Sequence, residues 1–159
     1  MRFSTADLND NNEGKVRIAL PGLYNFGGRR QFCGPIATVR VQDDNALVRA
    51  ALEEPGKGQV LVIDGAGSGR SALVGDKLAE LARKNGWAGI IVHGCIRDTA
   101  TIAGMDVGIK AVASTPARAG KQGKGERNVP VSFHAVTFTP GEYVYADEDG
   151  TLVSAEKLF

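Results

Sequence analysis

The sequence predicts a mixed α/β fold built as a single domain that spans residues 1–159. Short apolar runs with strand-like alternation recur along the chain, separated by glycine and proline. Two further segments place apolar residues at helical spacing, and one strand, helix and strand follow one another directly. A chain of this length can bury a core of ordinary size.

The first regular elements lie in the first third of the chain. Pro35–Val41 alternates toward apolar residues and is predicted to be a strand. Asp44–Leu52 carries Leu47 and Ala51 at helical spacing. Asp44 is a suitable N-cap for this helix, because its short carboxylate can accept from first-turn amides.

The middle of the chain predicts a βαβ unit. Val60–Asp64 and Gly89–His93 are the predicted strands. Ala72–Gly86, between them, is predicted to be helical, with its regular turns at Lys77–Asn85 and a C-cap at Gly86. Such a unit has a right-handed crossover and parallel strands that are often adjacent. Both strands then end at the same edge of the sheet, where open α/β sheets bind ligands.

The last third of the chain is predicted to form short strands, broken by glycine or proline. They lie within residues 108–113, 129–138, 142–147 and 150–155. Pro116–Arg127, "PARAGKQGKGER", is predicted to be an exposed basic loop that serves as a solvated connector.

Composition excludes several classes of function. A formal net charge of +1 gives no concentrated basic surface for nucleic acid. No apolar run approaches the ~20 residues that span a bilayer, and the polar N-terminus does not resemble a secretory signal. The two cysteines, Cys33 and Cys95, favour a reducing cytoplasm without a disulfide framework, and no zinc-binding spacing is present.

The stretch Val60–Arg70, "VLVIDGAGSGR", is typical of a strand that leads into a nucleotide-binding loop. A dinucleotide fingerprint needs a third glycine where Arg70 stands. A P-loop needs four residues between its glycines, and Gly65 and Gly69 enclose three. A methyltransferase needs an acid at the end of its second strand, where this chain has "VHGC". The loop is therefore predicted to be a tight turn that lets the backbone pass close to a neighbour.

A better candidate site begins at Gly75, where the predicted helix opens. The amides of Asp76, Lys77 and Leu78 should point out of its first turn, where they can bind a carboxylate. Taken alone, Asp76 is equally well explained as an ordinary first-turn acid, which the helix dipole favours.

The second half of this candidate site is Arg97-Asp98, directly after the second strand. Alone, a neighbouring arginine and aspartate usually form a surface ion pair. Beside the start of the helix, Arg97 becomes a clamp for a carboxylate and Asp98 an oxygen ligand for a divalent metal, with Asp76 as a second acid. Oxygen ligands favour Mg²⁺ or Mn²⁺, with water in the remaining positions.

Seven short motifs stand in order along the chain. They are "FGGR" (26–29), "DN" (44–45), "VLVIDGAGS" (60–68), "GDKLAELARKNGW" (75–87), "HGCIRD" (93–98), "DVGIKA" (106–111) and "PGEYVYADEDG" (140–150). Together they resemble the regulator of ribonuclease activity A (RraA) family over nearly the whole chain. That family overlaps the class II pyruvate aldolases that cleave 4-hydroxy-4-methyl-2-oxoglutarate, and some relatives have been labelled demethylmenaquinone methyltransferases.

The resemblance implies a layered β/β/α domain of the swivelling type, assembled as a homotrimer with sites at subunit interfaces. In the aldolase branch the acid of the Arg-Asp pair, here Asp98, holds Mg²⁺ or Mn²⁺, and Arg97 contacts the pyruvyl unit. The amides of Gly75–Leu78 take the carboxylate, and Asp76 handles a proton through metal-bound water. Members that only bind ribonuclease E can lack these acids, whereas this chain keeps both.

Four residues have no place in that assignment. Longer aldolases supply a further acid from a neighbouring C-terminal segment, and Glu156 is the only acid near the end of this chain. "FHAV" (133–136) stands where relatives commonly carry two glycines, and His134 is interpreted as a surface or packed histidine. His93 closes a buried strand or touches the pocket, and Cys95 is interpreted as a small buried residue because no nucleophile's partner is identifiable.

The predicted function is a divalent-metal-dependent lyase that forms pyruvate from 4-hydroxy-4-methyl-2-oxoglutarate or a related 2-keto acid. Oxaloacetate decarboxylation should accompany aldol cleavage, because both reactions pass through the same enolate, which the metal and Arg97 stabilise. The glycine loop is expected to form the floor of the pocket. The alternative is a non-catalytic regulator that binds and inhibits ribonuclease E, with the acids kept as structure.

Overall fold

The computed structural model describes residues 2–159. Its helices are α1 (Thr5–Asn11), α2 (Ala46–Glu53), α3 (Asp76–Lys84) and α4 (Thr99–Ala103). Its strands are β1 (Val16–Ile18), β2 (Tyr24–Asn25), β3 (Phe32–Arg40), β4 (Val60–Asp64), β5 (Ala72–Val74), β6 (Gly89–Ile96), β7 (Gly108–Ser114), β8 (Glu126–Arg127), β9 (Val131–Phe133), β10 (Val136–Phe138), β11 (Tyr143–Ala146) and β12 (Thr151–Ser154). Within this part of the chain, no helix has the length and apolar character needed to span a membrane.

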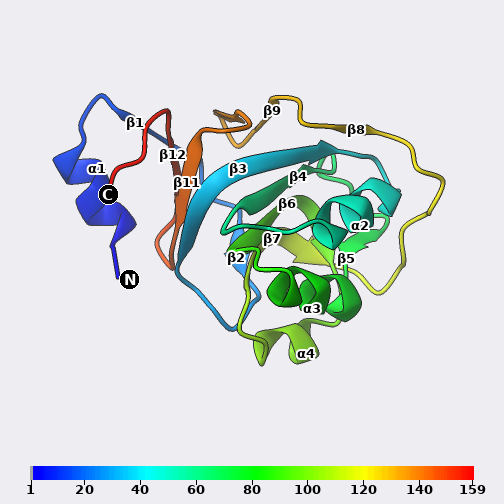
Figure 1. The fold of residues 1–159 in the computed structure, drawn as a ribbon. Coiled ribbons are helices and arrows are strands. Elements are labelled where there is room, and N and C mark those ends of the chain that lie inside the picture. Colours follow the sequence, from blue (N-terminus) through cyan, green and yellow to red (C-terminus); the bar gives the residue numbers. More distant parts are fainter. Residues whose placement is uncertain (1) are drawn as a thin grey trace.

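One sheet forms the centre of the molecule, with the strand order β1-β12-β11-β3-β4-β6-β7-β2. The central strands β3, β4, β6 and β7 are parallel, and antiparallel strands extend the sheet on both sides. Helices α2, α3 and α4 cover one face of the parallel part (Figure 1). The β9–β10 hairpin packs against β3 and β4 from the other side. The predicted mixed α/β class and its β/β/α layering are therefore confirmed.

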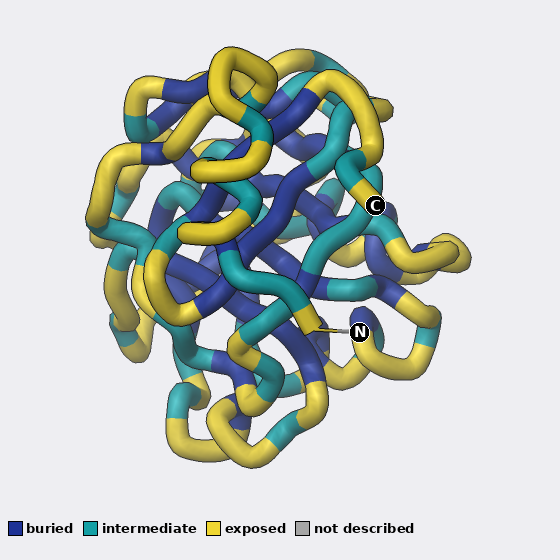
Figure 2. Tube along the Cα trace, turned by 90° about the vertical axis from the view of Figure 1, so that its left-hand side faces the viewer, coloured by how far each residue is buried: buried dark blue, intermediate teal, exposed yellow. Residues whose placement is uncertain are grey.

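The central strands are apolar at almost every position because both of their faces are covered. On β4, Leu61 and Ile63 belong to the core beneath the helices. Val60 and Val62 alternate with them and belong to the core beneath the β layer. Figure 2 shows these buried segments running through the middle of the molecule, with exposed turns around them. The sheet is thus a firmly packed base for the loops at its strand ends.

The predicted βαβ unit is present, since β4 and β6 are parallel neighbours with Val60 opposite Gly89. One boundary in it was predicted wrongly. Ala72–Val74 is strand β5 rather than the first turn of the helix, because all three residues are buried and the strand pairs with β6. Helix α3 begins only at Asp76, after Gly75.

The start of α2 also differs from the prediction. Its N-cap is Asn45, which makes no side-chain cap hydrogen bond, and Asp44 stands one residue earlier. The Asp44 carboxylate still accepts from the amide of Ala46, at 3.1 Å. It also accepts from the amides of Gln122 and Gly123, at 2.6 and 3.2 Å. Asp44 therefore joins two segments of the chain instead of capping one.

The basic loop Pro116–Arg127 is exposed over most of its length, as predicted. Its backbone is nevertheless tied to the body of the protein. The Ala117 carbonyl accepts from the Ala72 amide at 2.7 Å, and β8 at the end of the loop pairs with β3. The loop is thus an exposed connector whose path is fixed by these bonds.

A tight turn joins β9 to β10. His134 and Ala135 both have positive φ, 49° and 65°, in the region that glycine adopts with the least strain. That requirement explains why glycines suit this turn. His134 gains a partial compensation, because its Nδ1–H donates to the Leu20 carbonyl at 2.9 Å and its own carbonyl accepts from the Leu20 amide at 2.8 Å.

Candidate active site

The first turn of α3 forms one wall of the candidate site. Gly75 is the N-cap of this helix and has no side chain with which to cap it. The carboxylate of Asp98 takes that role, since its Oδ2 accepts from the Asp76 amide at 2.9 Å. A Cβ at position 75 would stand 2.7 Å from the same oxygen, so glycine allows this approach. The two loops after the βαβ strands meet as predicted.

Two of the three predicted anion-binding amides remain available. Within residues 2–159, the N–H groups of Lys77 and Leu78 have no hydrogen-bond acceptor. The N–H of Asp76 is already taken by Asp98, so the prediction was wrong for that amide. Two free donors and the positive end of the helix dipole leave a site for a small anion.

Asp98 has an unusual backbone conformation for a residue other than glycine. It is the N-cap of α4, with φ 60° and ψ 38°, in the left-handed region. Aspartate tolerates this region better than most residues, and the strain is about 1–2 kcal/mol. The Arg97 amide, just before it, donates to the Val74 carbonyl at 3.0 Å, which holds the end of β6 against the end of β5. Strain of this kind is often retained at functional sites.

These groups open onto a cavity of about 380 Å³. Its walls come from α2, α3, the start of α4 and the segment after β7. The lining residues are Asn45, Ala46, Arg49, Glu53, Ala72, Gly75, Asp76, Lys77, Leu78, Arg97, Asp98, Arg118, Ala119 and Lys121. Every residue predicted from the sequence to bind substrate or metal is therefore among them.

Cations outnumber carboxylates around this cavity. The cations are Arg49, Lys77, Arg97, Arg118 and Lys121, and the acids are Glu53, Asp76 and Asp98. Across residues 2–159, none of these five cations forms an ion pair. Like charges around one small volume repel one another, and a bound anion would relieve that repulsion. The cavity therefore favours a negatively charged ligand.

Sequence reasoning did not find the contribution of Arg49, Arg118 and Lys121. Arg49 lies in α2, which starts where β3 ends, and the other two lie in the basic loop. One signal for Arg49 was present, because a helix that follows a parallel strand begins at the ligand-binding edge of the sheet. The path of the loop could not be inferred, because it depends on contacts with Ala72 and Asp44.

The oxygen donors of the cavity suit a hard divalent cation that keeps most of its water. Asp98 Oδ1 receives no hydrogen bond within residues 2–159, and Asp76 and Glu53 line the same cavity. No cluster of three or more His, Cys, Asp or Glu side chains forms a preformed metal centre in this part of the chain. Mg²⁺ is commonly bound by one or two carboxylates plus water, whereas structural zinc needs four protein ligands. Asp98 is the residue that fits such a cation.

The glycine loop after β4 does not line this cavity, so the prediction that it forms the floor is wrong. Most of its donors are used within the protein, although the amides of Gly69 and Ser71 have no acceptor within residues 2–159. The amides of Gly65 and Gly67 both donate to the His93 carbonyl at 3.0 Å. The hydroxyls of Ser68 and Ser71 both donate to Asp43 Oδ1 at 2.7 Å. Glycine at position 65 lets the backbone pass close to His93 within β6, since a Cβ there would stand 2.9 Å from the His93 carbonyl oxygen.

His93 and Cys95 lie outside the cavity as well. The His93 ring stacks on Phe133 at 4.7 Å, and its Nδ1 lies 3.2 Å from Asp64 Oδ1. The strand predicted to end at His93 continues to Ile96, so His93 lies within β6 instead of closing it, and it does not touch the cavity. Burial raises the pKa of the Cys95 thiol, which keeps it protonated and unreactive. Cys33 and Cys95 are both free thiols, as predicted.

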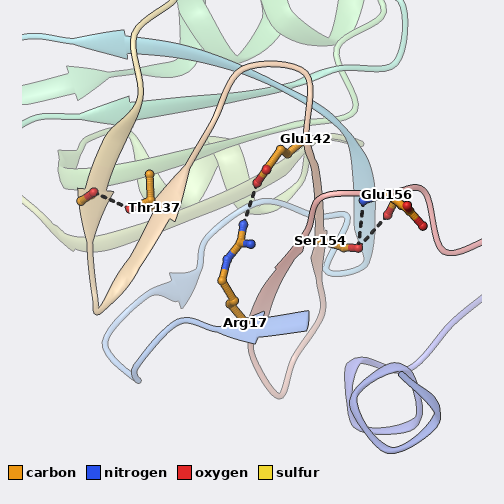
Figure 3. A network of polar contacts seen from close by, with 6 residues as sticks. Arg17, Thr137, Glu142, Ser154 and Glu156 are labelled. Atoms are coloured by element: carbon orange, nitrogen blue, oxygen red, sulfur yellow. Dashed lines mark hydrogen bonds and ion pairs between the residues drawn. The ribbon is translucent and has the colours of Figure 1, made fainter. Parts of the chain in front are cut away.

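Glu156 belongs to a different part of the surface. Ser154, at the end of β12, donates its hydroxyl to the Glu156 carbonyl at 2.7 Å (Figure 3). The nearby Arg17 pairs with Glu142 at 2.6 Å, not with Glu156. Glu156 lines a groove with Arg17 and Lys15 and does not reach the Arg97 cavity of its own chain.

Relatives of this chain are similar along its whole length. A protein of Aromatoleum aromaticum named "Putative 4-hydroxy-4-methyl-2-oxoglutarate aldolase" is 54% identical over 158 residues, covering 99% of both chains. A protein of Dechloromonas aromatica with the same name is 52% identical over 162 residues, again covering 99% of both.

Solved structures agree with the fold. The structure titled as the RNA-processing inhibitor RraA from Thermus thermophilis is 45% identical, with a TM-score of 0.96, and covers 100% of this chain and 96% of that one. A Geobacillus kaustophilus structure titled as a S-adenosylmethionine: 2-dimethylmenaquinone methyltransferase is 48% identical, with a TM-score of 0.96, and covers 98% and 97%. The family model described as RraA-like (Aldolase/RraA) matches residues 5–153, and the chain belongs to the RraA-like family.

Proposed function

We propose that this chain is a pyruvate-forming lyase that cleaves 4-hydroxy-4-methyl-2-oxoglutarate with a divalent metal and decarboxylates oxaloacetate in the same cavity. The observation that carries the proposal is the convergence of Asp76, Arg97 and Asp98 with two free amides in one cation-rich cavity. The names given to the Aromatoleum and Dechloromonas relatives support the choice of substrate.

Binding of the 2-keto acid end follows from the positive groups beside α3. The free amides of Lys77 and Leu78 hold its carboxylate at the helix N-terminus. The Arg97 guanidinium lies beside the keto oxygen, where negative charge develops when the adjacent carbon–carbon bond breaks. A permanently charged donor placed at that oxygen stabilises the transition state more than the substrate.

Asp76 is the proton carrier in this proposal. Its carboxylate accepts the proton of the substrate's 4-hydroxyl as the bond between C3 and C4 breaks. The bond electrons remain on C3 as the enolate of pyruvate, and the other fragment leaves as a second pyruvate. Asp76 then returns the proton to C3, which balances the reaction.

Asp98 would hold Mg²⁺ or Mn²⁺ through the oxygen that receives no hydrogen bond. When bound, the cation supplies Lewis-acid stabilisation of the enolate charge. The Asp76 amide fixes the other Asp98 oxygen, so this contact orients the ligating side chain.

A pyruvate-release assay tests the proposal. Purified protein is incubated with 4-hydroxy-4-methyl-2-oxoglutarate and, separately, with oxaloacetate, in the presence of Mg²⁺ or Mn²⁺. We expect pyruvate release above the metal-only rate with both substrates, and we expect EDTA to abolish it. Equal rates with and without protein at the same metal concentration would contradict the lyase assignment.

A second candidate is a regulator that binds and inhibits ribonuclease E. The 45% identity to a structure titled as an RNA-processing inhibitor favours it. Inhibition of ribonuclease E that persists in Asp76→Asn and Asp98→Asn variants, without pyruvate release by the parent protein, would establish this function instead.

We also propose that the protein is a cytoplasmic homotrimer. Exposed apolar side chains, among them Ile18, Leu20 and Tyr24, are available for contacts between copies. Light scattering should give about three times the chain mass of 16.7 kDa. A stable monomer at micromolar concentration would contradict the trimer.

A further inference from the structure

Two helices, not one, begin at the cavity. Because β3 and β5 both belong to the parallel part of the sheet, α2 and α3 start at the same edge. Asn45 and Ala46 at the start of α2 line the cavity together with Gly75–Leu78. Arg49 and Glu53 line it as well, so the cavity runs along one side of α2 from its start to its last residue.

Three cations accompany the start of α2. Arg49 lies on α2 itself, and Arg118 and Lys121 lie in the basic loop. These three residues, called here the α2-side cations, are exposed and form no ion pair within the described chain. Glu53 is the one acid that α2 contributes to the same cavity. The α2 side of the cavity thus carries a net positive charge of its own, in addition to the positive groups of Arg97 and the α3 amides.

Asp44 holds the loop beside α2. Its side chain is buried, and its two carboxylate oxygens accept from the amides of Ala46, Gln122 and Gly123. Burial raises its pKa, but these amides and nearby Lys124 outweigh burial, and the pKa is lowered overall. Asp44 therefore stays ionised and continues to join the start of α2 to the loop.

The loop is also paired with the chain on both sides of Asp44. The Gly120 amide donates to the Asp43 carbonyl at 2.8 Å, and the Gly120 carbonyl accepts from the Asn45 amide at 2.9 Å. Lys121 follows directly, so its position depends on these bonds.

We propose that the α2-side cations form a second anion subsite, which takes the far carboxylate of a dicarboxylic 2-keto acid. In this arrangement Asp44 is a positioning residue that keeps Arg118 and Lys121 over the cavity. The inference rests on the proposed function, in which Arg97 and the α3 amides hold the pyruvyl end. The two carboxylates of such a substrate then have separate cationic partners, Arg97 with the α3 amides at one end and the α2-side cations at the other.

A binding experiment tests this without relying on turnover. Calorimetry with Mg²⁺ present compares 2-oxoglutarate, a dicarboxylate without a cleavable 4-hydroxyl, with 2-oxobutanoate, a monocarboxylate. The parent protein should bind 2-oxoglutarate about tenfold more tightly or better, as expected for added charge-assisted hydrogen bonds. Arg49→Gln, Arg118→Gln and Lys121→Gln should each reduce this preference several-fold and leave 2-oxobutanoate binding nearly unchanged.

Lys124→Gln is the matched control. Lys124 is an exposed cation of the same loop, but it does not line the cavity. The substitution removes the same charge and should leave the preference unchanged. An equal loss with Lys124→Gln would mean that only the general charge of the loop matters, and it would overturn the subsite.

Asp44→Asn tests the positioning role. It should lower the preference for 2-oxoglutarate in the parent protein and add no further loss when Arg118 and Lys121 are already glutamine, because it acts through them. A similar loss in both backgrounds would overturn that role.

The two proposals can fail separately. Pyruvate release together with equal binding of both ligands would overturn the second subsite and keep the lyase. Absence of both pyruvate release and 2-oxobutanoate binding would overturn the proposed function and the subsite together.

Discussion

Two glycine-containing turns at the same edge of the sheet resemble one another in sequence and differ in what their polar groups do. The turn after β4 uses most of its donors internally, since Gly65 and Gly67 donate to the His93 carbonyl, and Ser68 and Ser71 donate their hydroxyls to Asp43. Its amides at Gly69 and Ser71 have no acceptor within residues 2–159. The turn at Gly75–Leu78 leaves two amides without an acceptor. Only the second turn lines the cation-rich cavity.

Glycine spacing alone therefore does not identify a ligand site. Glycine lets backbone come close to a neighbour, and that neighbour can be another strand or a substrate. What separates the two cases is where the unpaired amides lie. Those of Lys77 and Leu78 line the cation-rich cavity at the start of α3, and those of Gly69 and Ser71 do not line it.

Asp76→Asn should give the largest effect. Turnover should fall by about 10²- to 10⁴-fold, as is typical for a lost proton-transfer group. The unfolding free energy should change by no more than about 1 kcal/mol, because Asp76 adds only a first-turn charge to α3. Pyruvate release and thermal unfolding measure the two quantities. Full activity in this variant would show that Asp76 is an ordinary first-turn acid.

Arg97→Gln should reduce kcat/KM by about 10²- to 10³-fold, the usual cost of losing one donor to a developing oxyanion. Arg70→Gln is its control in the other turn, since Arg70 is an exposed arginine outside the cavity. Its activity should stay within about twofold of the parent value, as for most surface substitutions. Similar losses for both arginines would remove the distinction between the turns.

Gly75→Ala should displace the Asp98 carboxylate, because the new Cβ would stand 2.7 Å from Oδ2. The fold should persist, since the end of a side chain can move. Mg²⁺ affinity, measured by calorimetry, should fall by about 10- to 100-fold, as when a ligand loses its supporting contact.

Asp98→Asn should lower the same affinity without unfolding the protein, because asparagine also tolerates the left-handed backbone. Gly69→Ala is the control for Gly75→Ala, since a Cβ at position 69 meets nothing within 4 Å. Unchanged Mg²⁺ affinity in both Gly75→Ala and Asp98→Asn would exclude Asp98 as the metal ligand.

Ser68→Ala with Ser71→Ala should have the smallest effect on activity and a measurable effect on stability. Loss of two hydrogen bonds to Asp43 should lower the unfolding free energy by about 1–2 kcal/mol at neutral pH. Pyruvate release should stay nearly unchanged, because this turn lies outside the cavity. A strong loss of activity would show that the glycine loop contributes to the active site after all.

The stability difference of that double variant should depend on pH. Hydrogen bonds from Ser71 and Ser68 lower the pKa of Asp43 below its ordinary value of 3.8. A lowered pKa in the folded state contributes stability above the ordinary pKa, and that contribution is lost as the pH falls through the lowered one. When denaturant unfolding is measured at stepwise lower pH, the unfolding free energies of the parent and the variant should therefore converge. A constant difference would exclude the Asp43 carboxylate as its source.

Much of this site could be predicted because it follows from local patterns. The apolar run of β4, the amphipathic spacing of α3 and the second run at β6 are short-range signals, and parallel connection places both strand ends at one edge. Gly75, Asp76, Arg97 and Asp98 were placed together on that basis. The boundary at β5 was missed because three apolar residues fit a strand or a buried helical turn equally well.

Only the tertiary structure decided which polar groups are satisfied and which are free. The Asp76 amide is taken by Asp98, 22 residues away. The serines of the glycine loop are taken by Asp43, and the Gln122 amide reaches Asp44 across 78 positions. The residues next to a polar group in the sequence do not indicate its distant partner, because the packing of whole helices and strands brings the two together. The sequence therefore determined the edge of the sheet and the residues to which the chemistry is assigned in the proposal, and long-range hydrogen bonding determined where the charge of the cavity remains unpaired.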